Sequence, residues 1–183
     1  MTPMPRPRVG ISRCLLGDEV WYDGGHKQDP LLLEMLGPYV EWLPVCPEVE
    51  VGMSTPREPI HLVAAFDGVR SGEHCVRLVG VSSGRDWTDA MDQWRRARVR
   101  ELAEAELSGY VLKQDSPSCG MQGVRVQSDT GVVPTGRGLF AQALLEALPA
   151  LPIEEEGGLR NSRVREEFLA RVFAYHRGLC QGR

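Results

Sequence analysis

Three of the five cysteines in this chain of 183 residues share a sequence context that indicates a common role. Cys14 follows the run "RVGIS", Cys46 follows "EWLPV", and Cys119 follows "GYVLKQDSPS". Each of these cysteines comes just after a short apolar run typical of a strand. In an open parallel sheet the carboxyl ends of the strands meet at one edge, where ligands bind. The sequence therefore predicts that three thiols from distant segments lie near one another.

A cysteine at the end of a strand can also be a small apolar side chain that completes a core. The residues around these three sulfurs favour ligands over core packing. The segments "RCLLGD", "VCPEVEVG" and "SPSCG" supply Gly, Pro or Ser, which form tight turns and leave backbone amides free to donate to thiolates. By contrast, Cys75 alternates with apolar neighbours and is expected to be structural, while Cys180 lies in a polar tail.

Three thiolates suit only a few kinds of site. The four histidines form no pattern such as Cys-x-x-Cys with His-x-x-x-His, so a closed structural zinc site is not indicated. A single nucleophilic cysteine would leave two thiols unexplained. An iron–sulfur cluster in which one iron lacks a protein ligand suits three thiolates, and its open iron could bind a substrate as a Lewis acid. A three-thiolate zinc site with an open position competes with it, because ligand count does not separate the two.

Composition and charge restrict the location and the partners. The net charge of -4, from 21 Lys and Arg against 25 Asp and Glu, gives no general reason to expect binding to nucleic acid or a membrane. The N-terminal "MTPMPRPRVGIS" lacks the apolar core of a signal peptide, and no run reaches the roughly 18 apolar residues of a membrane span. We therefore expect a cytoplasmic protein, and the odd number of cysteines does not suggest a disulfide framework.

The elements that must position the cysteines alternate between strands and helices. Besides the strands that precede the cysteines, "DPLLLEML", residues 88–107 and "GRGLFAQALLEALP" have the pattern of helices. The segment "PIHLVAAFDGVRSGEHCVRLVGV" has the pattern of a hairpin. This alternation predicts an α/β fold with a mainly parallel sheet flanked by helices.

A final amphipathic helix is expected from Asn161 or Ser162 onward. Its apolar residues, spaced by 4, 4, 3 and 4, form a packing stripe: Val164, Phe168, Val172, Tyr175 and Leu179. We expect this helix, within residues 159–183, to pack on a single domain that spans residues 1–183. The preceding connector, "LPIEEEGGLRNS", is expected to be a turn whose acidic run is solvated.

Four segments together resemble the family of thiouracil desulfidases, which began as a domain of unknown function: "VGISRCLLGDEVWYDGGHK", "EWLPVCPEVEVGMSTPREPIHLV", "YVLKQDSPSCGM" and "GRGLFAQAL". The resemblance covers nearly the whole chain in order. It implies an α/β fold and a [4Fe–4S] cluster held by three cysteines, with one iron not bound by protein. It also implies an activity, in which a thiolated pyrimidine of the thiouracil or thiouridine type loses its sulfur as hydrosulfide without net redox change.

The resemblance assigns roles to individual residues. The cluster ligands would be the same three cysteines that their sequence context distinguishes. Glu48, two residues after Cys46, matches the family's catalytic acid or base. A serine of the "SPSCG" motif matches the other catalytic participant, and both Ser116 and Ser118 fit the pattern.

Weaker predictions concern other polar loops. In "WYDGGHK", Tyr22, Asp23 and Lys27 surround a Gly-Gly turn and could contact a pyrimidine, although an ordinary polar loop has the same composition. Arg57 in "STPREP" is expected to be structural. Arg137 in "PTGRGLFA" precedes a glycine-rich helix start that could hold an anion, but a plain structural role is favoured.

The expected partner is a small thiolated base or nucleoside. A tRNA substrate is less favoured, because the sequence shows no basic and aromatic platform for nucleic acid. Two functions from other classes remain open at this stage. The same three cysteines could serve a non-catalytic iron–sulfur or metal-binding sensor, or a zinc-dependent hydrolase.

Overall fold

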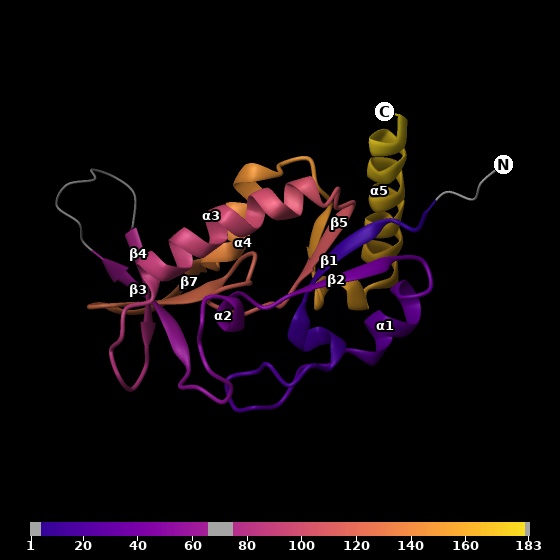
Figure 1. The fold of residues 1–183 in the computed structure, drawn as a ribbon. Coiled ribbons are helices and arrows are strands. Elements are labelled where there is room, and N and C mark those ends of the chain that lie inside the picture. The colour runs from indigo at the N-terminus through magenta and orange to yellow at the C-terminus, as the bar shows by residue number, and fades with distance from the viewer. Residues whose placement is uncertain (1–4, 66–74, 182–183) are drawn as a thin grey trace.

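Two four-stranded sheets, which share one long helix, form the fold (Figure 1). The structure is a computed structural model and describes residues 5–65 and 75–181. The first sheet has the order β2-β1-β5-β8, and all of its strands are parallel. These strands are β1 (Arg8–Ser12), β2 (Glu41–Val45), β5 (Gly109–Leu112) and β8 (Ile153–Glu155). The predicted α/β fold with a mainly parallel sheet is confirmed.

Helices cover both faces of this parallel sheet (Figure 1). On one face lie α1 (Pro30–Leu36) and α5 (Ser162–Gln181), the C-terminal helix that the sequence predicts. On the other face lie α3 (Thr88–Glu104) and α4 (Leu139–Ala147). Phe168 and Val172 of the predicted stripe are buried against the sheet. No helix in the part of the chain that the structure describes is long and apolar enough to cross a membrane.

Side chains of the central strands alternate between the two faces, as in any pleated strand. Val9, Ile11 and Val111 pack on the side of α5, while Tyr110 packs on the side of α3 and α4. The ring of Tyr110 lies over the neighbouring strand at Gly10, where a Cβ atom would be only 2.2 Å from the ring carbon Cδ2. Glycine is therefore required at this position by packing.

The second sheet has the order β4-β3-β6-β7. It contains two antiparallel pairs, β3 (Ile60–Ala65) with β4 (Cys75–Gly80), and β6 (Val124–Ser128) with β7 (Gly131–Gly136). The first pair is the predicted hairpin, and the residues that connect its strands lie outside the described ranges. Strands β3 and β6 are parallel and join the two pairs. Met91 of α3 packs on this sheet, so α3 links both sheets.

The carboxyl ends of the four parallel strands carry the segments of interest. After β1 comes a 3-10 helix, η1 (Arg13–Leu16), and after β2 comes the short helix α2 (Pro47–Glu50). The loop after β5 contains Cys119, and β8 is followed by a second 3-10 helix, η2 (Gly158–Arg160). One edge of the sheet therefore collects four loops from distant parts of the sequence.

The acidic run before α5 is not a solvated turn, so that prediction is wrong. Its residues form β8 and the turn after it, and Glu155 and Glu156 are only 8% and 5% exposed. The Glu156 carboxylate pairs with Lys113 and accepts the backbone N–H of Gln114 at 2.7 Å. The Glu155 carboxylate accepts the N–H of Met121 at 2.7 Å. These partners offset the cost of burying the carboxylates and attach the loop after β5 to β8.

We expect Gly10→Ala to lower the free energy of unfolding by about 1–3 kcal/mol, because its methyl group would overlap the buried Tyr110 ring. Gly178→Ala is the matched control, since Gly178 lies in α5 with no atom within 4 Å of an added Cβ. It should raise that free energy by up to about 1 kcal/mol through helix propensity. Urea denaturation measures both values, and equal effects of the two substitutions would contradict this packing constraint.

Candidate functional site

Cys14, Cys46 and Cys119 line one small pocket at the carboxyl edge of the parallel sheet. Their exposed fractions are 7%, 9% and 5%, and none of the three is in a disulfide. The structure thus brings together the three cysteines that the sequence distinguishes. Cys180 is free as well, but it is exposed near the end of α5.

The first two cysteines are held through their backbones. The carbonyl of Cys14 accepts the N–H groups of Gly17 at 3.3 Å and Lys27 at 3.0 Å, which closes the loop after β1. Cys46 directly precedes α2, and its N–H donates to Glu50 Oε1 at 3.1 Å. The other oxygen of Glu50 is 3.1 Å from Arg98 Nε in α3. The position of Cys46 is therefore tied to the long helix that joins the two sheets.

The Cys119 turn is built by Ser116 and by the start of α4. Ser116 Oγ accepts the N–H groups of Ser118 at 3.2 Å and Cys119 at 3.1 Å. The Ser118 carbonyl in turn accepts the N–H of Phe140 at 3.0 Å. A Cβ at Gly138 would lie 2.4 Å from the Ser118 carbonyl carbon, so this close approach requires glycine. The amides at the start of α4 therefore hold the cysteine turn.

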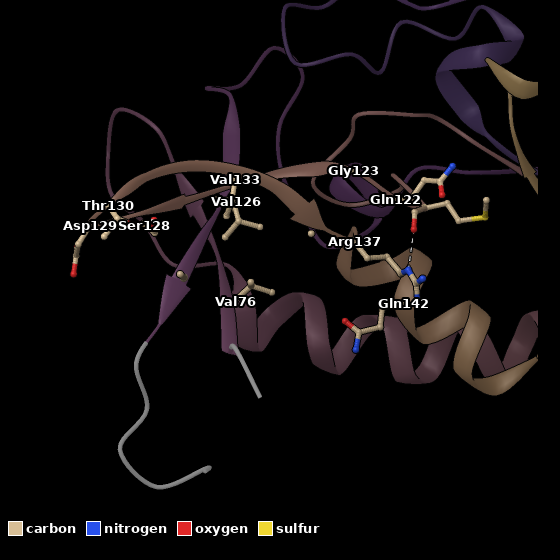
Figure 2. A pocket seen from close by; sticks show the side chains of 13 residues that line it. Val76, Gln122, Gly123, Val126, Ser128, Asp129, Thr130, Val133, Arg137 and Gln142 are labelled. Atoms are coloured by element: carbon tan, nitrogen blue, oxygen red, sulfur yellow. Dashed lines mark hydrogen bonds between the residues drawn. The ribbon is translucent and has the colours of Figure 1, made fainter. Parts of the chain in front are cut away.

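Arg137, just before this helix start, braces the same loop. Its Nε donates to the Met121 carbonyl at 2.8 Å, which agrees with the structural role that the sequence favours. Arg137 also lines a larger pocket of about 750 Å³ against the second sheet, where valines from three strands face the cavity (Figure 2). Among the described residues, neither the cysteines Cys14, Cys46 and Cys119 nor the predicted catalytic and substrate residues line this larger pocket.

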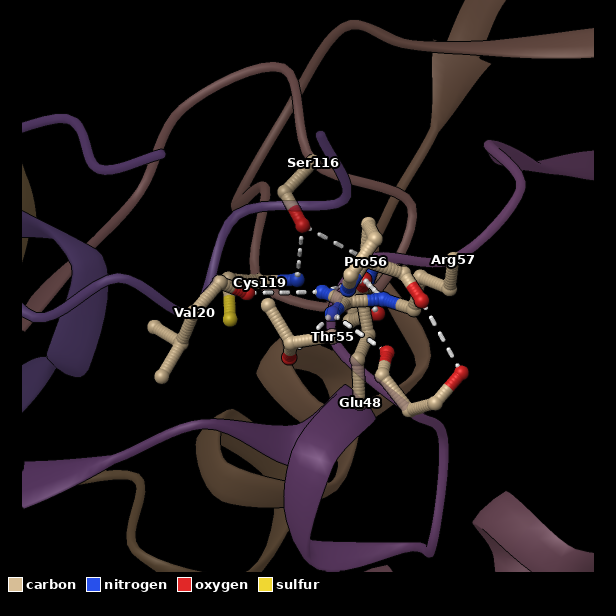
Figure 3. A network of polar contacts seen from close by, with 9 residues as sticks. Val20, Glu48, Thr55, Pro56, Arg57, Ser116 and Cys119 are labelled. Atoms are coloured by element: carbon tan, nitrogen blue, oxygen red, sulfur yellow. Dashed lines mark hydrogen bonds and ion pairs between the residues drawn. The ribbon is translucent and has the colours of Figure 1, made fainter. Parts of the chain in front are cut away.

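Glu48 lies in the first turn of α2, beside Arg57 (Figure 3). Ser118 Oγ donates to Glu48 Oε1 at 2.9 Å. Arg57 donates twice to the other oxygen, from Nε at 2.9 Å and from Nη2 at 2.5 Å. The side chains of Glu48 and Arg57 are 15% and 7% exposed. The structure thus places Ser118 in direct contact with Glu48, and Glu48 lines the same pocket as the cysteines.

The remaining donors of Arg57 are also used. Nη2 donates to the Val20 carbonyl at 3.0 Å, and Nη1 donates to the Ser54 carbonyl and to Thr55 Oγ1, both at 3.3 Å. Its backbone N–H donates to the Tyr22 carbonyl at 2.7 Å. Arg57 therefore fixes the Glu48 carboxylate and joins two loops over the pocket. No local sequence pattern indicates these contacts, because Arg57 lies nine residues from Glu48 and 37 residues from Val20, which is no helix or strand spacing.

Lys113 is a second cation at the pocket wall. Its ammonium group pairs with Glu156 and donates to the Gln114 carbonyl at 3.1 Å. Its backbone N–H donates to Ser12 Oγ at 2.9 Å, which joins the ends of β5 and β1. Sequence reasoning missed Lys113, although it lies within the quoted segment "YVLKQDSPSCGM".

Burial dominates the electrostatics of the three thiols. Burial and, to a smaller extent, the neighbouring Cys46 raise the pKa of Cys14 to about 12, while Lys113 acts in the opposite direction. Burial also raises the pKa of Cys46, and it raises that of Cys119 well above the usual value despite a hydrogen bond from Ser12. The uncomplexed thiols are therefore neutral near pH 7. A bound metal cation would displace their protons.

The predicted substrate residues lie in the loop between η1 and α1. Tyr22, Asp23 and Lys27 are exposed, and none of them lines the cysteine pocket. Asp23 Oδ1 accepts the N–H of Gly25 at 2.9 Å, and Lys27 Nζ lies 5.0 Å from the centroid of the Trp21 ring. Trp21 itself does line the pocket. A substrate contact by the three exposed residues stays a prediction.

Three cysteine thiols form a donor set that a metal cofactor can use as thiolates. Within residues 5–65 and 75–181, no three Cys, His, Asp or Glu side chains are placed to hold one metal ion. A single zinc ion held by the three cysteines would need each thiolate sulfur to lie about 2.3 Å from the zinc. In an iron–sulfur cluster the cysteines bind separate irons, so the sulfurs need not converge on one point. The pocket volume is about 20 Å³, near the room of one water, so lining side chains would have to move apart to admit a cluster.

Comparison with known proteins points to the same chemistry. A family model described as 2-thiouracil desulfurase matches residues 9–156, which include all three pocket cysteines. The uncharacterized protein YbbK of Bacillus subtilis (strain 168) is 29% identical over 138 residues, or 75% of this chain and 89% of YbbK. The solved structure of the [4Fe-4S]-dependent thiouracil desulfidase TudS matches with a TM-score of 0.64 and 29% identity, covering 88% of this chain and 99% of TudS.

We expect Arg57→Ala to lower the free energy of unfolding of the iron-free protein by about 3 kcal/mol, because it leaves the largely buried Glu48 carboxylate without its cation. Arg163→Ala is the control: it breaks an exposed ion pair with Glu167 and should cost less than about 1 kcal/mol. Urea denaturation gives both values. The double substitution Arg57→Ala with Glu48→Gln should recover part of the free energy of unfolding that Arg57→Ala loses, because no unpaired charge remains. If the double variant is no more stable than Arg57→Ala, the unpaired Glu48 carboxylate does not cause the loss.

Proposed function

Since this chain belongs to the 2-thiouracil desulfurase family, we propose that it is a [4Fe–4S]-dependent desulfidase of thiolated pyrimidines. The substrate would be a free base or nucleoside of the thiouracil or thiouridine type. Its thiocarbonyl group and one water would give the oxo-pyrimidine and hydrosulfide, without net redox change. The observation that carries the proposal is the set of three buried free thiols that line one pocket together with Glu48.

Cys14, Cys46 and Cys119 would hold the cluster as thiolates. When bound, the cluster supplies an iron that no protein side chain holds, which can act as a Lewis acid towards the sulfur of the substrate. The low exposure of the three cysteines limits the access of bulk water to their sulfurs. Lys113 and Arg57, which also line the pocket, place two cations beside this anionic set of ligands.

Glu48 would transfer protons between the water and the substrate. Its hydrogen bonds indicate which carboxylate oxygen takes part. Oε2 accepts two N–H groups of Arg57, so both of its in-plane lone pairs are used. Among the residues that the structure describes, Oε1 accepts a hydrogen bond from the Ser118 hydroxyl alone, which leaves it a lone pair. We therefore assign proton transfer to Oε1. As a general base it would take a proton from the attacking water, and it would return a proton when the tetrahedral form of the substrate collapses to the carbonyl.

The two serines would have different roles. Ser116 Oγ already accepts two backbone N–H groups of the Cys119 turn, so we propose that it supports the position of that ligand. Ser118 donates its only hydroxyl proton to Glu48 Oε1, so we propose that it orients the carboxylate. Loss of Ser118 should therefore affect catalysis more directly than it affects cofactor binding.

The proposal as a whole is tested with protein reconstituted under anaerobic conditions. We expect such protein to release sulfide from 2-thiouracil or 4-thiouracil. If it contains iron and acid-labile sulfide but releases no sulfide from any thiolated base or nucleoside, the chain is a non-catalytic cluster protein. If purified protein contains zinc without iron or acid-labile sulfide, the cluster proposal is wrong.

Substitution of each proposed ligand by alanine should abolish cofactor binding. We expect Cys14→Ala, Cys46→Ala and Cys119→Ala to contain little iron and acid-labile sulfide after anaerobic reconstitution and to lack the visible absorbance of a cluster. Cys180→Ala is the control, because this thiol is exposed in α5 and should leave both contents unchanged. Full cluster content in any of the three variants would remove that cysteine from the ligand set.

Substitution at Glu48 should separate catalysis from cofactor binding. We expect Glu48→Gln to keep its iron and sulfide content while kcat falls by about 10²–10⁴-fold, since the general base is lost. Ser118→Ala should also keep the cluster and lose part of kcat. Turnover with 2-thiouracil and iron content are measured on the same preparations. A fully active Glu48→Gln enzyme would show that this carboxylate does not transfer the proton.

A further inference from the structure

The Tyr110 hydroxyl is a buried polar group without a partner. Tyr110 has no exposed surface, and its Oη makes no hydrogen bond to any described residue. Two other buried atoms also lack a hydrogen bond, but each belongs to an ion pair, Asp92 with Arg95 and Arg98 with Glu50. Because buried polar groups are almost always hydrogen-bonded in native proteins, this single hydroxyl needs an explanation.

The position of the Tyr110 ring is fixed by packing. The ring lies over Gly10 and meets Phe140 edge-on, with ring centroids 5.7 Å apart and an interplanar angle of 62°. All of these contacts are made by the ring, and a phenylalanine would make them equally well. If packing alone selected the residue, phenylalanine would give the more stable protein, because it has no hydroxyl to desolvate.

The surroundings of the hydroxyl point towards one of the pocket cysteines. Tyr110 and Cys119 belong to the same cluster of buried side chains between the sheet and the helices α3 and α4. Burial raises the pKa of Tyr110 well above its usual value, and among the charges around it Cys119 acts most strongly, ahead of Glu50 and Arg98. Both Glu50 oxygens already have partners, the Cys46 amide and the Arg98 guanidinium. Of these neighbours, Cys119 is therefore the candidate acceptor for the Tyr110 hydroxyl.

We propose that the Tyr110 hydroxyl donates a hydrogen bond to the sulfur of Cys119 when that cysteine holds the cluster as a thiolate. The inference rests on the proposed function, because a neutral thiol is a poor acceptor whereas a thiolate is a good one. Tyr110 is then a positioning residue that acts through the ligand. Hydrogen bonds to cluster sulfurs raise the reduction potential and help to retain the metal.

The experiment compares Tyr110→Phe with wild type, with and without the cluster. In the iron-free protein, we expect the free energy of unfolding to stay equal or to rise. After anaerobic reconstitution, we expect the variant to lose iron to a chelator about tenfold faster, in line with the loss of a hydrogen bond to a metal ligand. Its reduction potential should be more negative than that of wild type. Tyr175→Phe, at a partly buried tyrosine of α5, is the matched control and should change none of these values.

Three outcomes would overturn the inference. Equal rates of iron loss and equal potentials for Tyr110→Phe and wild type would show that no such hydrogen bond forms. A clear loss of stability in iron-free Tyr110→Phe would show that the hydroxyl has a partner without the cluster. Failure of wild type itself to take up iron and sulfide would overturn the proposed function and this inference together, which distinguishes it from the first two outcomes.

Discussion

The parallel pairing of β1, β2, β5 and β8 is the constraint on which the site depends. In a parallel sheet every strand ends at the same edge, so the segments that follow are collected there whatever their distance in the sequence. Cys14, Cys46 and Cys119 are 32 and 73 residues apart along the chain, yet they line one pocket. A single antiparallel strand among the three would send its cysteine to the opposite edge.

The sheet brings the pocket residues near one another, and charged side chains then fix their positions. The Arg57 guanidinium holds Glu48, the Glu50 carboxylate holds the Cys46 amide, and Glu156 holds Lys113 together with the loop that leads to Cys119. The Arg57–Glu48 and Lys113–Glu156 pairs have low exposure, and breaking a buried pair leaves a charge without compensation. The pocket is thus surrounded by interactions whose loss is costly. Such a surrounding holds the Glu48 carboxylate in one orientation.

Much of this arrangement follows from the sequence, and its failures have a common cause. The strands before the cysteines, the long helix and the C-terminal helix are local patterns of apolar residues, and the structure contains them within a few residues of the predicted ends. The burial of Glu155 and Glu156 was not predicted, because the cation that pairs with Glu156 lies 43 residues away. Arg57 was taken for a turn residue because its partner Glu48, nine residues before it, lies at no helix or strand spacing that would indicate the contact. Strands β6 and β7 were missed, since short alternating runs give weak signals. A local sequence pattern indicates helices and strands, but it does not show which distant residue pairs with a given charged side chain.

The support of the Cys119 turn by α4 has a consequence for how the protein matures. All three pocket cysteines occur by residue 119, but the amides that hold the Ser118 carbonyl belong to residues 140 and 141, and the Glu156 carboxylate lies further on. A ribosome therefore releases the complete set of sulfurs well before it releases the elements that brace one of them. The pocket can take its final form only after about four-fifths of the chain has emerged. Any group that needs all three thiols in place is thus acquired late in biosynthesis, after the polypeptide has folded rather than while its first strands are still being made.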